Sequence, residues 1–285
     1  MNFEKEKKKY EKRYEEETRE LLVLTGEYVG GAGSVGNGIW SPSADILGYV
    51  DLKTGETEEK EGGLSWLARE EDKDGWIYCL EDLTIYHITC RKIKSGEVMK
   101  NAPEQFFNQF LLTGVVERNV SNPQLSAVLE KYKEIVTLED GDCGTFILDR
   151  HFNWFESALD WLGEECQVNL ECDEDKGLTA EKALAHFKQI YRNLKEWDEK
   201  FRRFAAEKLA ESACEWQDDA SDEEGEEAPV ITEEIFAQRI KICEFSIDAE
   251  GDYEVYYNDD DMFFGHVIII DGSVDGEMED AYIAG

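Results

Sequence analysis

Short runs of β-branched and aromatic residues, separated by glycine-rich or acidic turns, recur through the first third of the chain. Their length and spacing are typical of strands in a small barrel or sandwich. A mixed-charge segment, residues 1–20, precedes them and predicts a short solvated helix. The predicted strands are Leu21–Val29, Ile46–Leu52, Trp76–Leu80 and Leu83–Ile93.

A helix is predicted after a further strand at Phe106–Val116. Asn122 and Pro123 are the residue types that start helices, as N-cap and first helical residue. Leu125 and Leu129 then fall on one face. We therefore expect a β-rich N-terminal domain, barrel-like or sandwich-like, over residues 21–137 with one helix near its end.

The second half of the chain combines strands with one long amphipathic helix. The helix is predicted from Thr179 to Trp216, because large apolar residues recur there at spacings of three and four. Such a stripe predicts a face buried against a sheet. The stripe consists of Phe187, Ile190, Leu194, Trp197, Phe201 and Phe204. Strands are expected before it at Thr145–Arg150, Asn153–Leu159 and Gln167–Cys172.

An acidic segment of low hydrophobicity, residues 217–229, follows the helix and predicts a solvated loop. After it, alternating patterns separated by turns predict an antiparallel meander. The predicted class is therefore α+β, with a C-terminal antiparallel sheet packed by one long helix over residues 140–285. The meander strands are Gln238–Ile247, Asp252–Tyr257, Gly265–Asp271 and Glu277–Ala284.

Charge is distributed very unevenly along the 285 residues. The formal net charge is −36, from 66 acidic and 30 basic residues. The last 70 residues hold 22 acids against Arg239 and Lys241 alone, a net charge of −20. This balance argues against a protein that binds nucleic acid through its phosphates.

The cellular setting predicted from the sequence is the cytoplasm. The charged N-terminus lacks the apolar core of a secretory signal, and no apolar run approaches the ~20 residues of a membrane span, so no membrane association is expected. Seven scattered cysteines without a C-x-x-C pair favour a reducing compartment.

Two motifs resemble ligand-binding loops, one rich in glycine and the other in acidic residues. Residues 31–36 fit G-x-G-x-x-G, but the Asn-Gly and Ser-Pro pairs that follow leave no room for the phosphate-binding helix, which predicts a flexible loop. Asp271, Ser273, Asp275 and Glu277 follow a calcium-loop spacing, although Tyr282 occupies the position of the bidentate glutamate. We expect no cofactor beyond a weak divalent cation there, with an ordinary acidic hairpin as the alternative.

A second acidic group, near residue 260, suggests an enzyme as one alternative. Carboxylates with an imidazole suit metal-assisted hydrolysis. The set would comprise Asp259, Asp261, His266 and Asp271. A solvated hairpin tip is the competing interpretation.

The segments at residues 146–156 and 250–266, taken with the long helix, resemble a known family. It is the bacterial domain-of-unknown-function family twenty-two sixty-two, and the resemblance covers about residues 140–285. It implies a bacterial cytoplasmic α+β domain, supplies no catalytic residues, and suggests a link to toxin-immunity proteins.

The leading functional hypothesis is a non-enzymatic binding protein. Its acidic C-terminal face would dock a basic protein such as a toxin or nuclease, because dense charge steers association. The residues expected at this surface are Asp259, Asp260, Asp261 and Glu279. In the competing hypothesis the acidity only maintains solubility.

Overall fold

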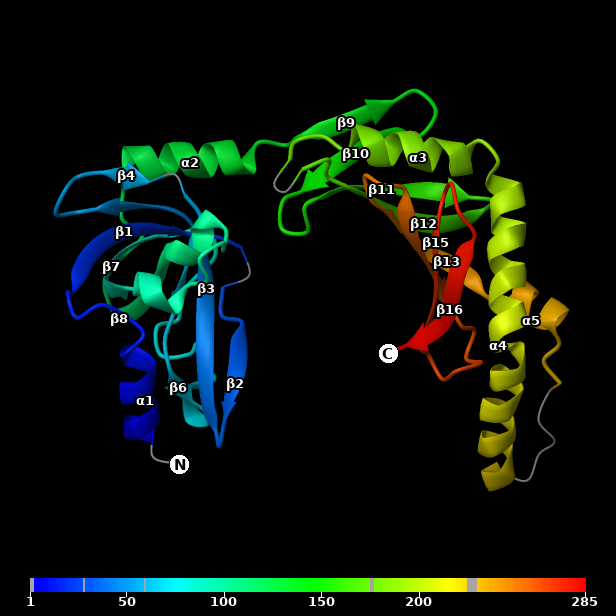
Figure 1. Ribbon diagram of the computed structural model, residues 1–285, viewed down its shortest axis with the longest axis horizontal. Coiled ribbons are helices and arrows are strands. Elements are labelled where there is room, and N and C mark those ends of the chain that lie inside the picture. Colours follow the sequence, from blue (N-terminus) through cyan, green and yellow to red (C-terminus); the bar gives the residue numbers. More distant parts are fainter. Residues whose placement is uncertain (1–2, 28, 59, 175–176, 225–229) are drawn as a thin grey trace. The chain divides into compact units, whose positions relative to one another are not determined.

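The computed structural model describes residues 3–27, 29–58, 60–174, 177–224 and 230–285. They form two compact units, Met1–Glu134 and Ile135–Gly285 (Figure 1). Each unit has its own eight-stranded sheet and its own hydrophobic core. Helices and strands are mixed in both, which confirms the predicted α+β class.

The N-terminal unit is built on a sheet that closes on itself. Its path runs β1-β7-β8-β5-β3-β2, and an additional β1–β3 pairing completes a ring of five strands. This confirms the barrel-like expectation. The strands are β1 (Arg19–Thr25), β2 (Ala32–Gly36), β3 (Ile39–Asp51), β4 (Thr57–Glu58), β5 (Gly62–Ser65), β6 (Ala68–Arg69), β7 (Ile85–Lys92) and β8 (Gln109–Arg118).

Glycines allow the ring to close where β5 meets β8 in parallel. A Cβ on Gly62 would lie 2.2 Å from the carbonyl oxygen of Asn108, so this position tolerates no side chain. Inside the ring, Leu21, Ile46 and Phe110 are at most 1% exposed. Their burial supplies the apolar area that stabilises the barrel.

Two helices flank this barrel, α1 (Phe3–Glu11) and α2 (Pro123–Lys133). The predicted start of α2 is confirmed, because the Asn122 side chain accepts a hydrogen bond of 2.9 Å from the backbone N–H of Leu125. Leu125 is fully buried against the barrel. Three short 3-10 turns complete the unit, at Glu70–Asp72, Ser95–Glu97 and Glu104–Phe107.

Three predictions for the N-terminal unit were wrong in detail. Helix α1 ends at Glu11, so residues 12–18 lie outside the helix predicted for 1–20. The strand predicted at Trp76–Leu80 is a series of turns, because Trp76 and Ile77 have φ of 49° and 78°, which no strand allows. The glycine-rich segment is not a loop but contains β2, which forms a hairpin with β3.

The C-terminal unit contains an open sheet in the order β16-β15-β14-β13-β12-β11-β10-β9. Neighbours are antiparallel except for β12 and β13, which are parallel because three helices connect them. The strands are β9 (Thr137–Asp140), β10 (Gly144–Asp149), β11 (Trp154–Trp161), β12 (Glu164–Glu171), β13 (Lys241–Ile247), β14 (Asp252–Asn258), β15 (Val267–Ser273) and β16 (Met278–Ala284).

The single helix predicted over Thr179–Trp216 is two helices, α3 (Glu181–Tyr191) and α4 (Leu194–Glu224). They change direction at residues 192–193, as Figure 1 shows. Asp173, rather than Thr179, caps α3, since its carboxylate accepts from the backbone N–H groups of Glu181 and Lys182. A short helix, α5 (Glu233–Arg239), precedes β13.

The acidic segment predicted as a loop over residues 217–229 is helical up to Glu224, and residues 225–229 lie outside the described residues. Helix α4 continues past Trp216, where contacts with the β14–β15 turn hold it. Trp216 stacks on Phe264 with ring centroids 5.7 Å apart, and Gln217 donates to the carbonyl oxygen of Asp261 at 3.0 Å.

The aromatic stripe packs on the sheet, as predicted. Phe187 and Phe201 are fully buried, and both rings contact Phe245 of β13. Trp197 is partly buried against the same core. None of the helices in the described ranges has both the length and the apolar content that a membrane crossing requires.

Candidate functional site

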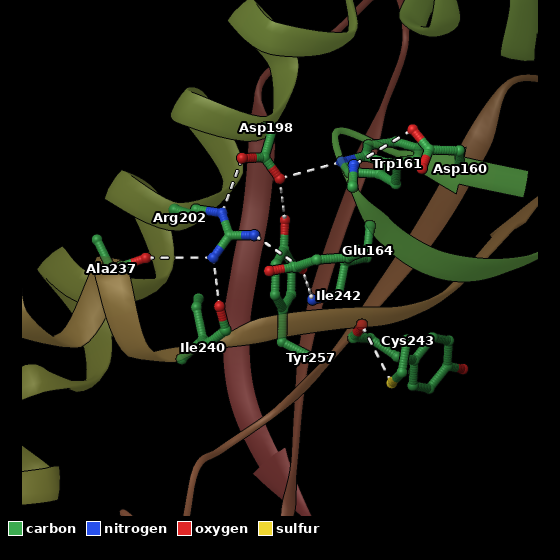
Figure 2. Close-up of polar contacts among 12 residues, drawn as sticks. Asp160, Trp161, Glu164, Asp198, Arg202, Ala237, Ile240, Ile242, Cys243 and Tyr257 are labelled. Atoms are coloured by element: carbon green, nitrogen blue, oxygen red, sulfur yellow. Dashed lines mark hydrogen bonds and ion pairs between the residues drawn. The ribbon is translucent and has the colours of Figure 1, made fainter.

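A buried polar cluster lies where α4 meets the sheet (Figure 2). Arg202 donates to Asp198 at 2.7 Å and to Glu164 at 3.1 Å. The same Asp198 carboxylate accepts from Trp161 Nε1 at 3.0 Å and from the Tyr257 hydroxyl at 3.4 Å. Burial raises the pKa of the Tyr257 phenol, which keeps it protonated as a donor.

This cluster is structural. Arg202 also donates to the carbonyl oxygens of Ala237 and Ile240, and Glu164 accepts from the backbone N–H of Ile242 at 3.0 Å. The cluster thereby joins α4, the start of β12, α5 and β13. Its charges are satisfied by protein groups, as buried charges must be.

Asp259, predicted at the partner surface and in the hydrolase set, is a buried turn residue. Only 4% exposed, its carboxylate accepts from the backbone N–H groups of Phe263 at 2.7 Å and Gly265 at 3.2 Å. It also accepts from Asp261 N at 3.3 Å. Its lone pairs hold the β14–β15 turn together, so it is neither a rim charge nor a free general base.

The other residues of this turn do not converge on one point. Asp260 pairs with Arg239 at 2.8 Å, and Asp261 is exposed. His266 Nδ1 contacts the carbonyl oxygen of Phe263, and its ring packs on Trp216. The first contact holds the imidazole within its own turn, and the second packs it on α4.

Asp271 lies at the opposite end of β15. It is five positions from His266, which corresponds to about 17 Å along a strand. The structure therefore splits the predicted hydrolase set. Among the described residues, which include Asp271, Asp275 and Glu277 of the calcium-like spacing, no group of three or more His, Cys, Asp or Glu side chains is arranged to hold a metal ion.

A groove with a volume of about 590 Å³ crosses the C-terminal sheet on the face away from the helices. Alternation along the strands creates it: Val168 and Leu170 point into the core, whereas Asn169 and Glu171 line the groove. The lining residues are Phe152, Trp154, Asn169, Glu171, Glu244, Ser246, Ile247, Asp248, Asp252, Tyr253, Glu254, Tyr256, Asp271, Gly272 and Glu279.

The groove is strongly acidic. Seven of its described lining residues are carboxylates and none is a lysine or arginine. Burial raises the pKa of Glu244, and burial with the charges of Glu254 and Asp280 raises that of Asp271. The pKa of Glu171 is raised by burial and by Asp248 and Glu250. Uncompensated negative charge at one site raises the affinity for a cation.

The groove floor is ordered by hydrogen bonds. Asn169, 2% exposed, donates to Glu244 Oε1 at 2.7 Å and to Ser246 Oγ at 3.3 Å. These contacts fix the Glu244 carboxylate in position. At one end, Phe152 is 54% exposed and stacks on Trp154 with centroids 4.7 Å apart.

Sequence reasoning located this site only in part. Asp271 and Glu279 line the groove, but the hairpin acids at 259–261 do not. Five groove carboxylates were missed, and two of them, Glu244 and Glu254, lie at outward-facing positions of strands that the sequence did predict. Acids alternating with apolar residues on adjacent strands were the available signal.

Comparison with known proteins adds the family. A model described as an uncharacterized protein conserved in bacteria (DUF2262) matches residues 140–283, just over half of the chain. A second model, a domain of unknown function (DUF7021), is similar to residues 6–132. No curated protein and no solved structure matches. The described residues that line the groove all lie within the first match, and the chain belongs to the DUF2262 family.

Proposed function

We propose that this chain is a non-enzymatic binding protein that docks a basic partner through the groove of its C-terminal unit. One observation carries the proposal: seven carboxylates and no basic side chain among the described residues that line a single groove. Their repulsion is relieved when a cationic surface covers them. Charge of one sign in a concave surface also focuses the field and accelerates association.

Binding agrees better with the groove than catalysis does. Its described lining residues include no histidine and no cysteine, the side chains most used as base and nucleophile at neutral pH. The buried Asp198–Arg202 cluster is occupied by structural contacts. The metal-assisted hydrolase alternative gains no support from the separated positions of His266 and Asp271.

The partner class we propose is a basic protein such as a toxin or nuclease, which the groove would cover in the manner of an immunity protein. The bacterial cytoplasm is the proposed setting. It is supported by the family's description as conserved in bacteria and by seven free cysteines.

The test compares two triple variants of equal charge, using cytochrome c as a folded basic probe. The first neutralises the groove through Glu171→Gln, Glu244→Gln and Asp271→Asn. The matched control neutralises three exposed acids outside it, Glu165, Glu211 and Glu215, to Gln.

We expect the groove variant to associate about tenfold more slowly in stopped-flow measurements at low salt, with little change in the control. Burial disfavours the charged form and raises the pKa of all three groove acids, so we expect their neutral replacements to keep the fold. Equal slowing in both variants would show that only net charge matters, and the proposal would fail.

A further inference from the structure

Strand β2 forms a free edge of the N-terminal sheet. In the described parts of the chain it pairs with β3 alone, and Figure 1 shows it outside the ring of five strands. Its residues 33–35 are exposed. A free edge presents unpaired backbone N–H and C=O groups, which can pair with a strand of another chain.

This edge differs in charge from the other free edges of the molecule. Five strands of the described residues have a neighbour on one side only, and charged residues on such an edge hinder pairing with another chain. Strand β2 contains no charged residue, and residues 28–44 around it contain none either, although 34% of the chain is charged. The other four edges all carry charge: Glu58 in β4, Arg69 in β6, Glu139 and Asp140 in β9, and Glu279 and Asp280 in β16.

The register of the β2–β3 hairpin shows which backbone groups of β2 face outward. Ala32 lies opposite Pro42, which has no N–H, so these two residues cannot form a hydrogen-bonded pair. The N–H and C=O of Ala32 therefore point away from β3. Because the direction alternates along a strand, the same groups of Gly33 point towards β3 and those of Ser34 point away from it.

These outward groups are complementary to a second copy of themselves. An antiparallel pair of β2 strands centred on Gly33 places Ala32 of each copy opposite Ser34 of the other, and each such pair exchanges N–H···O bonds in both directions. The two Gly33 residues then meet where paired strands come closest, and they have no side chain to obstruct the approach. A two-fold axis generates this contact from a single strand.

The distribution of charge favours a second copy as the occupant of this edge. Residues 1–134 hold 25 acidic and 18 basic residues, a net charge of −7, whereas the C-terminal unit carries −29. Two copies that meet at β2 therefore join their less charged units at a strand without charge. A strongly basic partner would gain little there, because β2 offers it no carboxylate.

We propose that two copies of this chain associate through antiparallel pairing of their β2 strands, which continues the N-terminal sheet from one copy into the other. This interaction surface is separate from the acidic groove and does not depend on the proposed function. Strand β2 has five residues, whereas a standard interface uses about 20–30 residues a side. We therefore expect a weak dimer, with a Kd of about 0.1 mM.

The experiment measures the mass of the full chain by sedimentation equilibrium at concentrations from about 5 μM to about 0.5 mM, which lie on either side of that Kd. Ser34→Asp places a carboxylate on each strand, at diagonal positions of the pair. Ser34→Pro instead removes an outward N–H and adds no charge. The matched control is Ser121→Asp, at an exposed serine of the same unit that lies outside the strands.

We expect the mass of the unmodified chain to rise from 32.7 kDa towards twice that value over this range, and Ser121→Asp to behave in the same way. Both Ser34 variants should weaken the dimer at least about tenfold. Raising the salt from about 0.1 M to about 1 M should tighten the dimer of the unmodified chain, because it screens the repulsion between two chains of net charge −36. Docking of a basic partner in the groove should weaken over the same range, which separates the two interactions.

Urea unfolding checks that the variants fold. Ser34 is exposed and its N–H points away from β3, so each variant should unfold close to the midpoint of the unmodified chain. If the proline variant unfolds earlier, Ser34→Asp still decides the question. A chain that remains monomeric at about 0.5 mM would overturn the inference and leave the edge to a strand of another protein. A dimer that all the variants form equally well would also overturn it, because the contact would then lie elsewhere.

Discussion

Asp259 illustrates how one carboxylate can be assigned the wrong role from its neighbours in sequence. Three consecutive acids suggest a solvated tip, and Asp260 and Asp261 are indeed exposed. Asp259 instead turns inward and accepts three backbone N–H bonds, which lets the chain pass from β14 to β15. The sequence shows that acidic residues are dense here, but it does not show which of the three adjacent carboxylates accepts the backbone hydrogen bonds of the turn.

A prediction at this scale follows from those bonds. Asp259→Ala leaves the N–H groups of Phe263 and Gly265 without this acceptor, so we expect a loss of about 1–3 kcal/mol in the free energy of unfolding. Asp261→Asn, at an exposed neighbour, is the control and should change the free energy of unfolding by at most about 0.5 kcal/mol, because asparagine tolerates the φ of 60° at this position as aspartate does. Urea titration followed by tryptophan fluorescence measures both, and equal midpoints would contradict the assigned role.

At the scale of elements, the spacing of apolar residues predicted the buried faces of the helices better than it predicted where the helices begin and end. The spacing of Phe187, Trp197 and Phe201 correctly gave the buried side of α3 and α4. It could not give the break at residues 192–193, because a stripe continues across a change of helix direction. Nor could the acidic composition after Trp216 reveal that contacts with the β14–β15 turn keep α4 helical.

Short and glycine-rich strands were the elements missed. Strand β5 contains Gly62 and Gly63, and β2 contains Gly33 and Gly36, so neither resembles the β-branched runs that sequence reasoning detects. Strand β2 is placed by its hairpin with β3, and β5 is placed by pairing with β3 and with β8, which lies far from it in sequence. Tertiary contacts therefore overrode local propensity.

The attachment of α4 to the sheet gives a prediction for an element. Removing Arg202 leaves the largely buried carboxylates of Asp198 and Glu164 without their ion-pair partner. Arg202→Ala should therefore lower the free energy of unfolding by about 3–5 kcal/mol. Arg203→Ala is the matched control, since Arg203 is exposed and forms an ion pair with Glu207 one turn away; its effect on the free energy of unfolding should stay below about 1 kcal/mol. Comparable unfolding free energies in urea for the two variants would show that the cluster does not fasten the helix.

For the whole molecule, the two units differ most in charge. Residues 135–285 hold 41 acidic against 12 basic residues, a net charge of −29 out of −36. Such an excess repels itself and opposes the compact state. A partner that neutralises the groove would relieve part of this repulsion, which links the stability of the C-terminal unit to binding.

This asymmetry predicts that salt stabilises the two units unequally. Between about 0.01 M and 0.15 M salt the Debye length falls from about 30 Å to 8 Å, which screens repulsion across a unit of this size. Hydrogen exchange read out by residue should therefore slow more in the core strands β12–β15 than in β1, β3 and β7 of the N-terminal barrel. The groove triple variant, with three charges fewer, should show a smaller difference between the two salt concentrations. If both cores gained the same protection, the repulsion would be spread evenly over the molecule. The charge of the C-terminal unit would then not destabilise that unit in particular, and a partner that neutralised the groove would not stabilise it.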